Sequence, residues 1–280
     1  FQTYKAELYN DCRNILGEGI TWSKDQENLY WVDIAIPSKL LKLDLTADRL
    51  SIFNMPEKIT SLSIIDNENL IVASKSGINN FNLITKKLSN LLKVEPSLGN
   101  RSNDGAADAK GRFWFGTMQD NFDKYGNDIP VTKRNGNLYR LDKNLKLNII
   151  ESKLGIPNTF VWSPDNTKFY FADTLDGIIF RYDFDLNLGL ISNKTFFAKF
   201  HRGFPDGSAI DSKGYLWNAR WGGSCVVRFD PDGKIDRVIE VPVKNVTNCI
   251  FGGKNLNILF ITTARQGLSE QYLKNNPIAG

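Results

Sequence analysis

Six polar residues recur at corresponding places along the chain, each four positions before an apolar or acidic anchor. They are Glu18, Thr60, Asp104, Asn158, Asp206 and Thr247. If the fold brings them together, they need a cation, because unpaired buried carboxylates repel one another and lose solvation. Their oxygens suit a hard ion such as Ca²⁺, Mg²⁺ or Mn²⁺ and tolerate Zn²⁺. The alternative is that they are turn residues, since Asp-Gly and Asn are common in turns.

The remaining reactive side chains offer few other chemistries. His201 is the only histidine, so a Ser-His-Asp or Cys-His site must use it, and its neighbours suggest a loop. The chain has no P-loop, no GxGxxG after a strand and no HExxH. The three cysteines have no CxxC spacing, and their odd number argues against a closed disulfide framework. We expect buried thiols in a reducing compartment.

The composition is that of an ordinary globular protein. Of 280 residues, 41% are hydrophobic and 24% charged, and the net charge is +4 with no basic run. We therefore expect no nucleic-acid partner. No apolar run approaches the roughly 20 residues of a membrane span, and we expect no signal peptide. We expect a cytoplasmic protein that is a monomer or a weak homo-oligomer and has no membrane partner.

The elements that position the polar residues belong to an internal repeat. Each unit has short runs of β-branched and aromatic residues separated by Gly, Asn and Asp turns, and no stretch has helical periodicity. The steps between the anchors Trp22, Ile64, Asp108, Trp162, Ile210 and Phe251 range from 41 to 54 residues. That period is typical of propeller blades, whereas a sandwich rarely repeats so evenly and β-helix periods are shorter. The sequence therefore predicts an all-β protein, a six-bladed β-propeller.

The repeat also predicts how the chain is organised. We expect one domain over residues 1–280, with the first strand of each unit beginning beside a central channel that could hold a site. The longest step contains a polar insertion, residues 119–135, which we expect to be a loop. The sixth unit lacks its last strands, and residues 1–12 are expected to supply a strand that completes this last blade.

Several motifs in the same order resemble the senescence marker protein-30, gluconolactonase and luciferin-regenerating enzyme-like family, also called regucalcin-like proteins. The resemblance runs from about Asn14 to Gly280, with a likeness to bacterial sugar lactonases around Trp221-Gly222-Gly223. Its carriers are Leu16-Gly17-Glu18-Gly19, Arg101-Ser102-Asn103-Asp104-Gly105, Gly116-Thr117-Met118, Ile156-Pro157-Asn158, Gly203-Phe204-Pro205-Asp206-Gly207 and Thr262-Thr263-Ala264-Arg265.

The resemblance implies a six-bladed propeller with one catalytic divalent ion, which could be Ca, Zn, Mn, Mg or Fe. Carried over by position, the implied metal ligands are Glu18, Asn158 and Asp206, with Asn103 as a fourth ligand that acts directly or through water. The implied substrate-binding residues are Arg101, Asn103, Asn121 and Trp221. The family often has an acid where this chain has Asn121, so the substrate contacts differ here.

The implied activity is hydrolysis of an aldonolactone, such as a glucono-, xylono-, arabino- or galactonolactone, to the aldonic acid. The metal would polarise the lactone carbonyl, and Asp206 would be the catalytic residue that orients or deprotonates the attacking water. Three alternatives remain: a broader esterase or phosphotriesterase with the same metal site, a non-catalytic calcium-binding regulatory protein, and a propeller that serves only as a binding scaffold.

Overall fold

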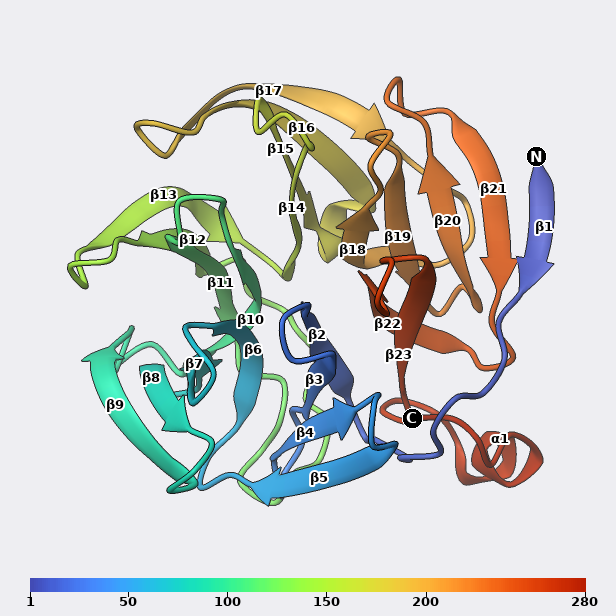
Figure 1. The fold of residues 1–280 in the computed structure, drawn as a ribbon, viewed down its shortest axis with the longest axis horizontal. Helices are drawn as coiled ribbons and strands as arrows, with labels where there is room; N and C mark the ends of the chain where they lie inside the picture. Colours follow the sequence, from blue (N-terminus) through green and yellow to red (C-terminus); the bar gives the residue numbers. More distant parts are fainter. The chain divides into compact units, whose positions relative to one another are not determined.

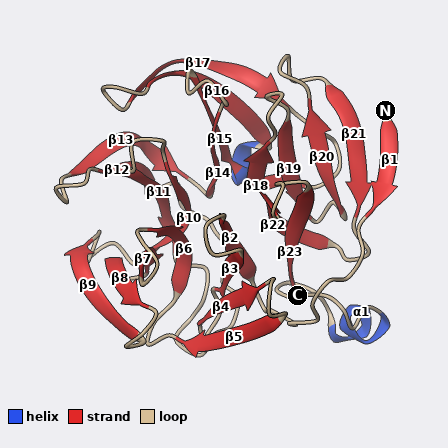
Figure 2. Ribbon diagram, viewed as in Figure 1, coloured by secondary structure: helices blue, strands red, loops and turns tan.

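The computed structural model describes residues 1–280, and its regular structure consists almost entirely of β-strands, β1 to β23 (Figure 1). Figure 2 shows two short helical segments, the 3-10 helix η1 (Thr174–Asp176) and the helix α1 (Glu270–Asn275). The six residues of α1 are too few to produce a helical period, so the sequence gives no sign of this helix. Neither helix has the length and apolar character needed to cross a membrane.

The chain divides into two compact units. Unit 1 comprises residues Phe1–Gly17, Asn158–Ile250 and Phe260–Gly280, and unit 2 comprises Glu18–Pro157 and Phe251–Leu259. The expectation of a single domain over residues 1–280 stays a prediction.

Unit 2 contains three antiparallel sheets of four strands each, and in each sheet the strands follow chain order. The first sheet has β2 (Gly17–Ser23), β3 (Asn28–Asp33), β4 (Lys39–Asp44) and β5 (Arg49–Asn54). The second has β6 (Ile59–Ile64), β7 (Asn69–Ser74), β8 (Gly77–Asn82) and β9 (Lys87–Lys93). The third has β10 (Asn100–Ala107), β11 (Phe113–Gln119), β12 (Gly136–Leu141) and β13 (Leu147–Leu154). Strand β6 contacts both β3 and β10, so the three sheets are neighbours.

Unit 1 contains two further large sheets and most of a small one. One large sheet has β14 (Pro157–Trp162), β15 (Lys168–Asp173), β16 (Ile178–Asp185) and β17 (Leu190–Ala198). The other has β18 (Phe204–Ile210), β19 (Leu216–Trp221), β20 (Cys225–Phe229), β21 (Ile235–Glu240) and, at its edge, β1 (Gln2–Lys5). The small sheet pairs β22 (Asn245–Gly252) with β23 (Ile258–Ala264).

The prediction of six blades is wrong, because the all-β propeller has five. Five sheets have four or five strands, whereas the sixth repeat forms only the two-stranded sheet β22–β23. The N-terminal strand does not join that sheet. Instead β1 pairs in parallel with β21, in a register that places Thr3 opposite Val238. After β23 the chain turns into the helix α1, whose N-cap is Ser269, so no further strand extends the sixth repeat.

Hydrophobic residues in neighbouring sheets pack against one another to form the core. In unit 2, the second and third sheets share a buried cluster that includes Ile78, Phe115 and Leu141. Burying a side chain of this size contributes about 1.5 to 3 kcal/mol. Strands β5 and β9, which lie at the edges of their sheets, contain no fully buried residue. The six recurring polar residues lie on the first strands, each of which contains several buried residues.

Two turns between first and second strands repeat one hydrogen-bonded motif, in which an Asp lies six residues before a Trp. Asp211 Oδ1 accepts from the backbone N–H groups of Lys213 and Tyr215, and its Oδ2 accepts from Trp217 Nε1 at 3.0 Å and Arg228 Nη2 at 2.6 Å. Asp108 makes the equivalent bonds to its own turn and to Trp114. These two aspartates are therefore structural.

Replacing Asp211 by Asn should lower the free energy of unfolding by about 2 to 3 kcal/mol at neutral pH, since hydrogen bonds to charged groups contribute that much. Burial acts to raise the pKa of Asp211, but the bonds from Arg228 and Trp217 outweigh it and hold the pKa below its ordinary value. A carboxyl with a lowered pKa stabilises the folded state above its unfolded pKa, and this stabilisation disappears as the pH falls through the folded pKa.

The difference between wild type and the Asp211→Asn variant should therefore shrink as the pH is lowered below about 4. Urea unfolding at a series of pH values measures it. Asp232→Ala, at an exposed turn position, is the control and should unfold like wild type. A pH-independent difference would mean that the charge of Asp211 contributes nothing to folding.

Candidate active site

All six recurring polar residues lie within strands, each in the first strand of its sheet, so the alternative that they are turn residues is wrong. They are Glu18 in β2, Thr60 in β6, Asp104 in β10, Asn158 in β14, Asp206 in β18 and Thr247 in β22. Each is between 0% and 7% exposed. Their enclosure is set by the repeat, because it places each of them at the same point of an enclosed first strand.

β-Bulges occur at these positions in three of the sheets. In β10, Asn103 and Asp104 lie between two paired residues, Ser102 and Gly105, whose partners are only two residues apart on β11. In β18 the same irregularity includes Asp206, and in β6 it includes Thr60. A bulge leaves its residues outside the regular ladder and changes the direction of their side chains, which is why bulges often lie next to active sites.

The two threonines of the set join neighbouring strands. The Thr60 hydroxyl lies 2.6 Å from the Ser102 hydroxyl on β10. Thr247 Oγ1 donates to the Gly17 carbonyl at 2.5 Å and lies 2.8 Å from Thr262 Oγ1. Both residues are thus occupied by contacts within the fold, and the acids and amides remain the candidate ligands.

In unit 1, the structure brings Asn158 and Asp206 together on adjacent sheets. Asn158 Nδ2 donates to Thr174 Oγ1 at 2.7 Å, and Thr174 Oγ1 donates to the carbonyl of Pro205, the residue before Asp206. Thr159 Oγ1 donates directly to the Asp206 carbonyl at 2.6 Å. Two hydroxyls therefore fix the backbone of Asp206 relative to that of Asn158.

The residue after Asn158 has an unusual backbone. Thr159 has a φ of 63°, in the left-handed region that β-branched residues avoid. Gly19, which follows Glu18 in the same way, has a φ of 60°. Non-glycine residues in this region are strained, and they persist where the surrounding structure holds them, often at functional sites. Here the hydroxyl bond of Thr159 to β18 holds it.

Arg220 is a residue of unit 1 that no sequence motif pointed to. It is 1% exposed, and its guanidinium donates to the carbonyls of Phe200, Arg202 and Gly203 and to Asn218 Oδ1. Burial lowers the pKa of Arg220 to about 10, against an opposing effect of the Asp206 carboxylate, so it stays charged at neutral pH. It thus places a positive charge near Asp206 and fixes the segment that leads into β18.

Trp221 and His201, two further residues that the sequence singles out, belong to the same unit. Trp221 ends β19, half-buried, and pairs in register with Phe204, which is 53% exposed. His201 is exposed and packs its ring edge-on against Phe200, so it lies in a loop as the sequence suggested.

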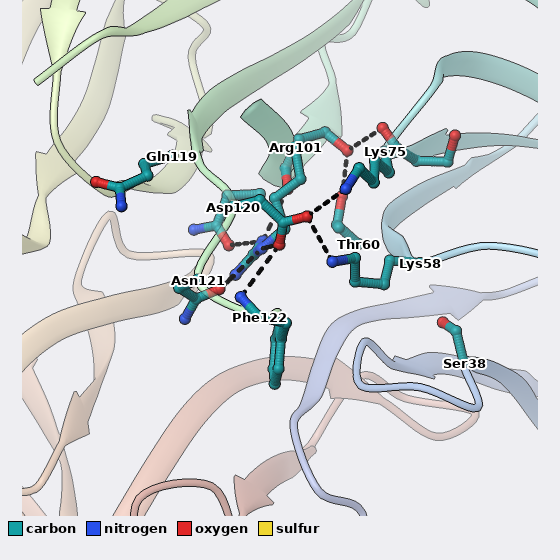
Figure 3. Close-up of polar contacts among 12 residues, drawn as sticks. Ser38, Lys58, Thr60, Lys75, Arg101, Gln119, Asp120, Asn121 and Phe122 are labelled. Carbon is teal, nitrogen blue, oxygen red and sulfur yellow. Dashed lines mark hydrogen bonds and ion pairs between the residues drawn. The ribbon is translucent and has the colours of Figure 1, made fainter. Parts of the chain in front are cut away.

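In unit 2, the structure brings Arg101, Asn103 and Asn121 together in one network, and Figure 3 shows Arg101 beside Asn121. The buried Arg101 guanidinium donates twice to Asn121 Oδ1, at 3.0 Å from Nε and 2.8 Å from Nη2. Its Nη1 donates to Asn103 Oδ1 at 3.0 Å, and Asn103 Nδ2 donates to the Pro157 carbonyl. Glu18, also in unit 2, is buried and accepts a hydrogen bond from the N–H of Gly19.

The charged residues behind this network were not foreseen. Lys58 and Lys75 both donate to Asp120 Oδ2, at 2.5 Å and 2.7 Å, and Asp120 Oδ1 lies 3.9 Å from Arg101 Nε. Figure 3 shows Asp120 between the two lysines and Arg101. Lys58 is only 4% exposed and lies over the Phe122 ring. The sequence gives little sign of this ion pair. Lys58 lies directly before the first strand of one sheet and Asp120 at the end of the second strand of the next, 62 residues away.

The pKa shifts in this group follow from burial and crowding of positive charge. Burial lowers the pKa of Lys58, and the nearby Lys75 and Arg101 lower it further, against the opposing effect of Asp120. For Asp120, burial acts to raise the pKa, but the bonds from both lysines outweigh it and the pKa falls below its ordinary value. Asp120 is therefore ionised at neutral pH.

The structure supports parts of the predicted site within each unit. Asn158 and Asp206 are neighbours in unit 1, and Arg101, Asn103 and Asn121 are neighbours in unit 2. No group of three His, Cys, Asp or Glu side chains forms a metal cluster, but the predicted ligand set has two carboxylates and two amides and is not of that kind. The four-residue ligand set stays a prediction.

Comparisons with known proteins all point to one family. A family model described as "SMP-30/Gluconolactonase/LRE-like region" matches residues 16–265. The L-arabinolactonase of Azospirillum brasilense is 36% identical over 99% of this chain and 90% of its own length. The 6-deoxy-6-sulfogluconolactonase of Pseudomonas putida is 32% identical over 95% and 89%. The crystal structure of a calcium-binding protein, regucalcin, from Agrobacterium tumefaciens superposes with a TM-score of 0.92 at 30% identity, covering 100% of this chain and 92% of the other.

Proposed function

The chain belongs to the SMP-30/gluconolactonase/LRE-like family, and from this premise we propose that it hydrolyses a sugar lactone to the open-chain acid with the help of a divalent metal ion. Its relatives named for L-arabinolactone and 6-deoxy-6-sulfogluconolactone support the substrate class. The proposed ligands are Glu18, Asn158 and Asp206, with Asn103 as a fourth.

The chemistry of these residues fits a hard divalent ion. Glu18 and Asp206 are 6% and 5% exposed, and burying a carboxylate is costly unless a cation accompanies it. The NH₂ group of Asn158 donates to Thr174 Oγ1, so the amide oxygen of Asn158 points away from Thr174. Carboxylate and amide oxygens are the ligands that calcium, magnesium and manganese prefer. Asn103 Oδ1 already accepts from Arg101, so we favour its contact with the ion through water.

The reaction adds a water oxygen to the lactone carbonyl carbon and breaks the ring C–O bond. A divalent ion, when bound, supplies Lewis-acid polarisation of the carbonyl. Asp206 orients the attacking water and takes its proton, which then passes to the departing ring oxygen. Arg101 holds Asn103 and Asn121 in place, and these two amides fix the substrate's polar groups.

The proposal depends most on how hydrogen bonds fix Asn158 and Asp206 next to each other. Two buried polar residues on different sheets are tied together by Thr159 and Thr174, and one of these ties requires a strained backbone at Thr159. Elsewhere a threonine joins two first strands without such strain, since Thr247 Oγ1 donates to the Gly17 carbonyl and Thr247 is not among the residues with a positive φ. Strain maintained around a buried carboxylate is typical of a functional site.

Removing divalent ions should abolish turnover. The purified chain, treated with a chelator and assayed on a panel of aldonolactones, is expected to lose at least about 100-fold in rate and to regain it when one of Ca²⁺, Mg²⁺, Mn²⁺, Zn²⁺ or Fe²⁺ is added back. Melting gives an independent readout, because an ion present at about 100 times its Kd stabilises the folded state by about 2.7 kcal/mol.

The outcomes separate the competing functions. Ion-dependent stabilisation without turnover of any lactone or ester would favour a calcium-binding protein that is not an enzyme. Turnover of aryl esters or phosphotriesters in preference to sugar lactones would favour a broader hydrolase. Full lactonase activity in the chelated protein would contradict metal dependence.

A further inference from the structure

The orientation of Asn121 determines which substrate group it can recognise. Its Oδ1 accepts two hydrogen bonds from the Arg101 guanidinium, at 3.0 Å and 2.8 Å. Because the oxygen is held there, the NH₂ group is directed away from Arg101, as Figure 3 shows. That NH₂ group donates no hydrogen bond within the protein, and the residue is half-buried. Asn121 therefore offers a hydrogen-bond donor and no acceptor.

A group of charged side chains lies behind Asn121. The basic cluster, which we define as Lys58, Lys75, Arg101 and Asp120, has three cations around one carboxylate. Both lysines share one oxygen of Asp120, whereas Arg101 Nε is 3.9 Å from the other oxygen, beyond hydrogen-bond range. The carboxylate is thus neutralised mainly by the lysines, and the charge of Arg101, directly behind Asn121, is the less compensated one.

The cluster is accessible at one end only. Lys58 and Asp120 are 4% and 7% exposed, but the Lys75 side chain is 49% exposed. Burial lowers the pKa of Lys58, and Lys75 and Arg101 lower it further against the opposing effect of Asp120. Attraction between this cluster and a ligand acts over several ångströms, so no direct contact with the lysines is required.

We propose that the lactone hydrolysed by this chain carries a negatively charged substituent, a carboxylate, sulfonate or phosphate, which accepts a hydrogen bond from Asn121 Nδ2 and is attracted by the basic cluster. The proposal rests on the proposed function, and it narrows the substrate from sugar lactones in general to anionic ones. A lone amide donor selects against a neutral group only weakly, whereas charge complementarity provides specificity and faster association.

The experiment compares lactones that differ in one group. The holoenzyme is assayed with a neutral hexonolactone that has a terminal hydroxymethyl group and with analogues whose terminal hydroxyl is replaced by sulfonate, carboxylate or phosphate. We expect kcat/KM to be at least about 10-fold higher for one of the anionic lactones, and the ratio to fall as salt is added.

Variants test the two parts of the recognition. Asn121→Asp has the same shape but replaces the donor by a carboxylate, so the ratio of anionic to neutral kcat/KM should fall by about 10-fold or more. Lys75→Gln removes one charge from the cluster and should lower the ratio by about 3- to 5-fold. Lys110→Gln, an exposed lysine in the β10–β11 turn of the same unit, is the matched control and should leave the ratio unchanged.

The possible failures can be told apart. If neutral lactones are hydrolysed as well as every anionic one, or if Asn121→Asp and Lys75→Gln leave the ratio unchanged, the anionic substituent is wrong and the lactonase function stands. If no lactone of either charge is hydrolysed, the proposed function fails and this inference fails with it.

Discussion

Asp206→Ala should lower kcat/KM for the best sugar lactone by about 1,000-fold or more. The residue is proposed to be both a metal ligand and the group that takes the proton from water, and loss of a general base alone typically costs about 10²- to 10⁴-fold. Asp206→Asn separates the two roles, because it keeps an oxygen ligand of the same size and removes the base. We expect it to bind the ion more weakly and to remain at least about 100-fold slower at saturating ion.

The measurement is steady-state release of acid, at several concentrations of the divalent ion, with melting curves to show that each variant is folded. Asp232→Ala, exposed in the same sheet's β20–β21 turn, is the control for removing one negative charge and should keep the wild-type rate. Should Asp206→Ala hydrolyse lactones at near the wild-type rate, neither role can be correct, and the basis for placing the chemistry on β18 disappears.

The repeat in the sequence predicted the strands well because each repeat is a local pattern. Turn residues such as Asp211 and Gly214 and the alternating run Leu216–Trp221 can be recognised within a dozen residues, and the structure forms the hairpin there. The number of blades depended on the residues after the last hairpin. The segment beyond Ala264 has no alternating pattern, and it forms a turn and a short helix instead of two more strands.

The place of the N-terminal strand could not be predicted from local pattern. Gln2–Lys5 pairs with β21, more than two hundred residues away, through backbone groups that carry no sequence signal. Its four residues are all exposed, so no apolar face indicates which sheet it joins. The expectation that it completes the sixth repeat came from a count of missing strands and had no physical interaction behind it.

In the candidate site, too, features set by the local repeat could be predicted, whereas contacts between different repeats could not. The polar positions at the start of each repeat were predicted correctly as a structurally equivalent set, because the repeat aligns them. The sequence could not show which of the six residues make structural hydrogen bonds instead. The bonds of Thr60 to Ser102 and of Thr247 to Gly17 join different repeats, so no local pattern predicts them. The pairing of Lys58 with Asp120 spans 62 residues in the same way.

Arg220→Met should lower the free energy of unfolding by about 3 to 5 kcal/mol, the second large effect that we expect. The guanidinium is the hydrogen-bond donor for three backbone carbonyls, those of Phe200, Arg202 and Gly203, and for Asn218 Oδ1. Methionine fills a similar volume and donates nothing. The free energy lost is therefore the cost of leaving these acceptors unsatisfied in a region where Phe200 and Asn218 are 4% and 0% exposed.

The same substitution should also reduce activity, because the carbonyls that Arg220 holds belong to the segment leading directly into β18 and Asp206. Thermal melting, urea unfolding and lactone hydrolysis well below the melting temperature measure the two effects separately.

Arg220→Lys keeps a charge but cannot span four acceptors, so its stability should lie between those of wild type and Arg220→Met. Arg13→Met, an arginine of the same unit whose side chain is 61% exposed, should change neither property. Wild-type stability in Arg220→Met would mean that water replaces the guanidinium at these carbonyls, and wild-type activity would mean that the Phe200–Gly203 segment does not position Asp206.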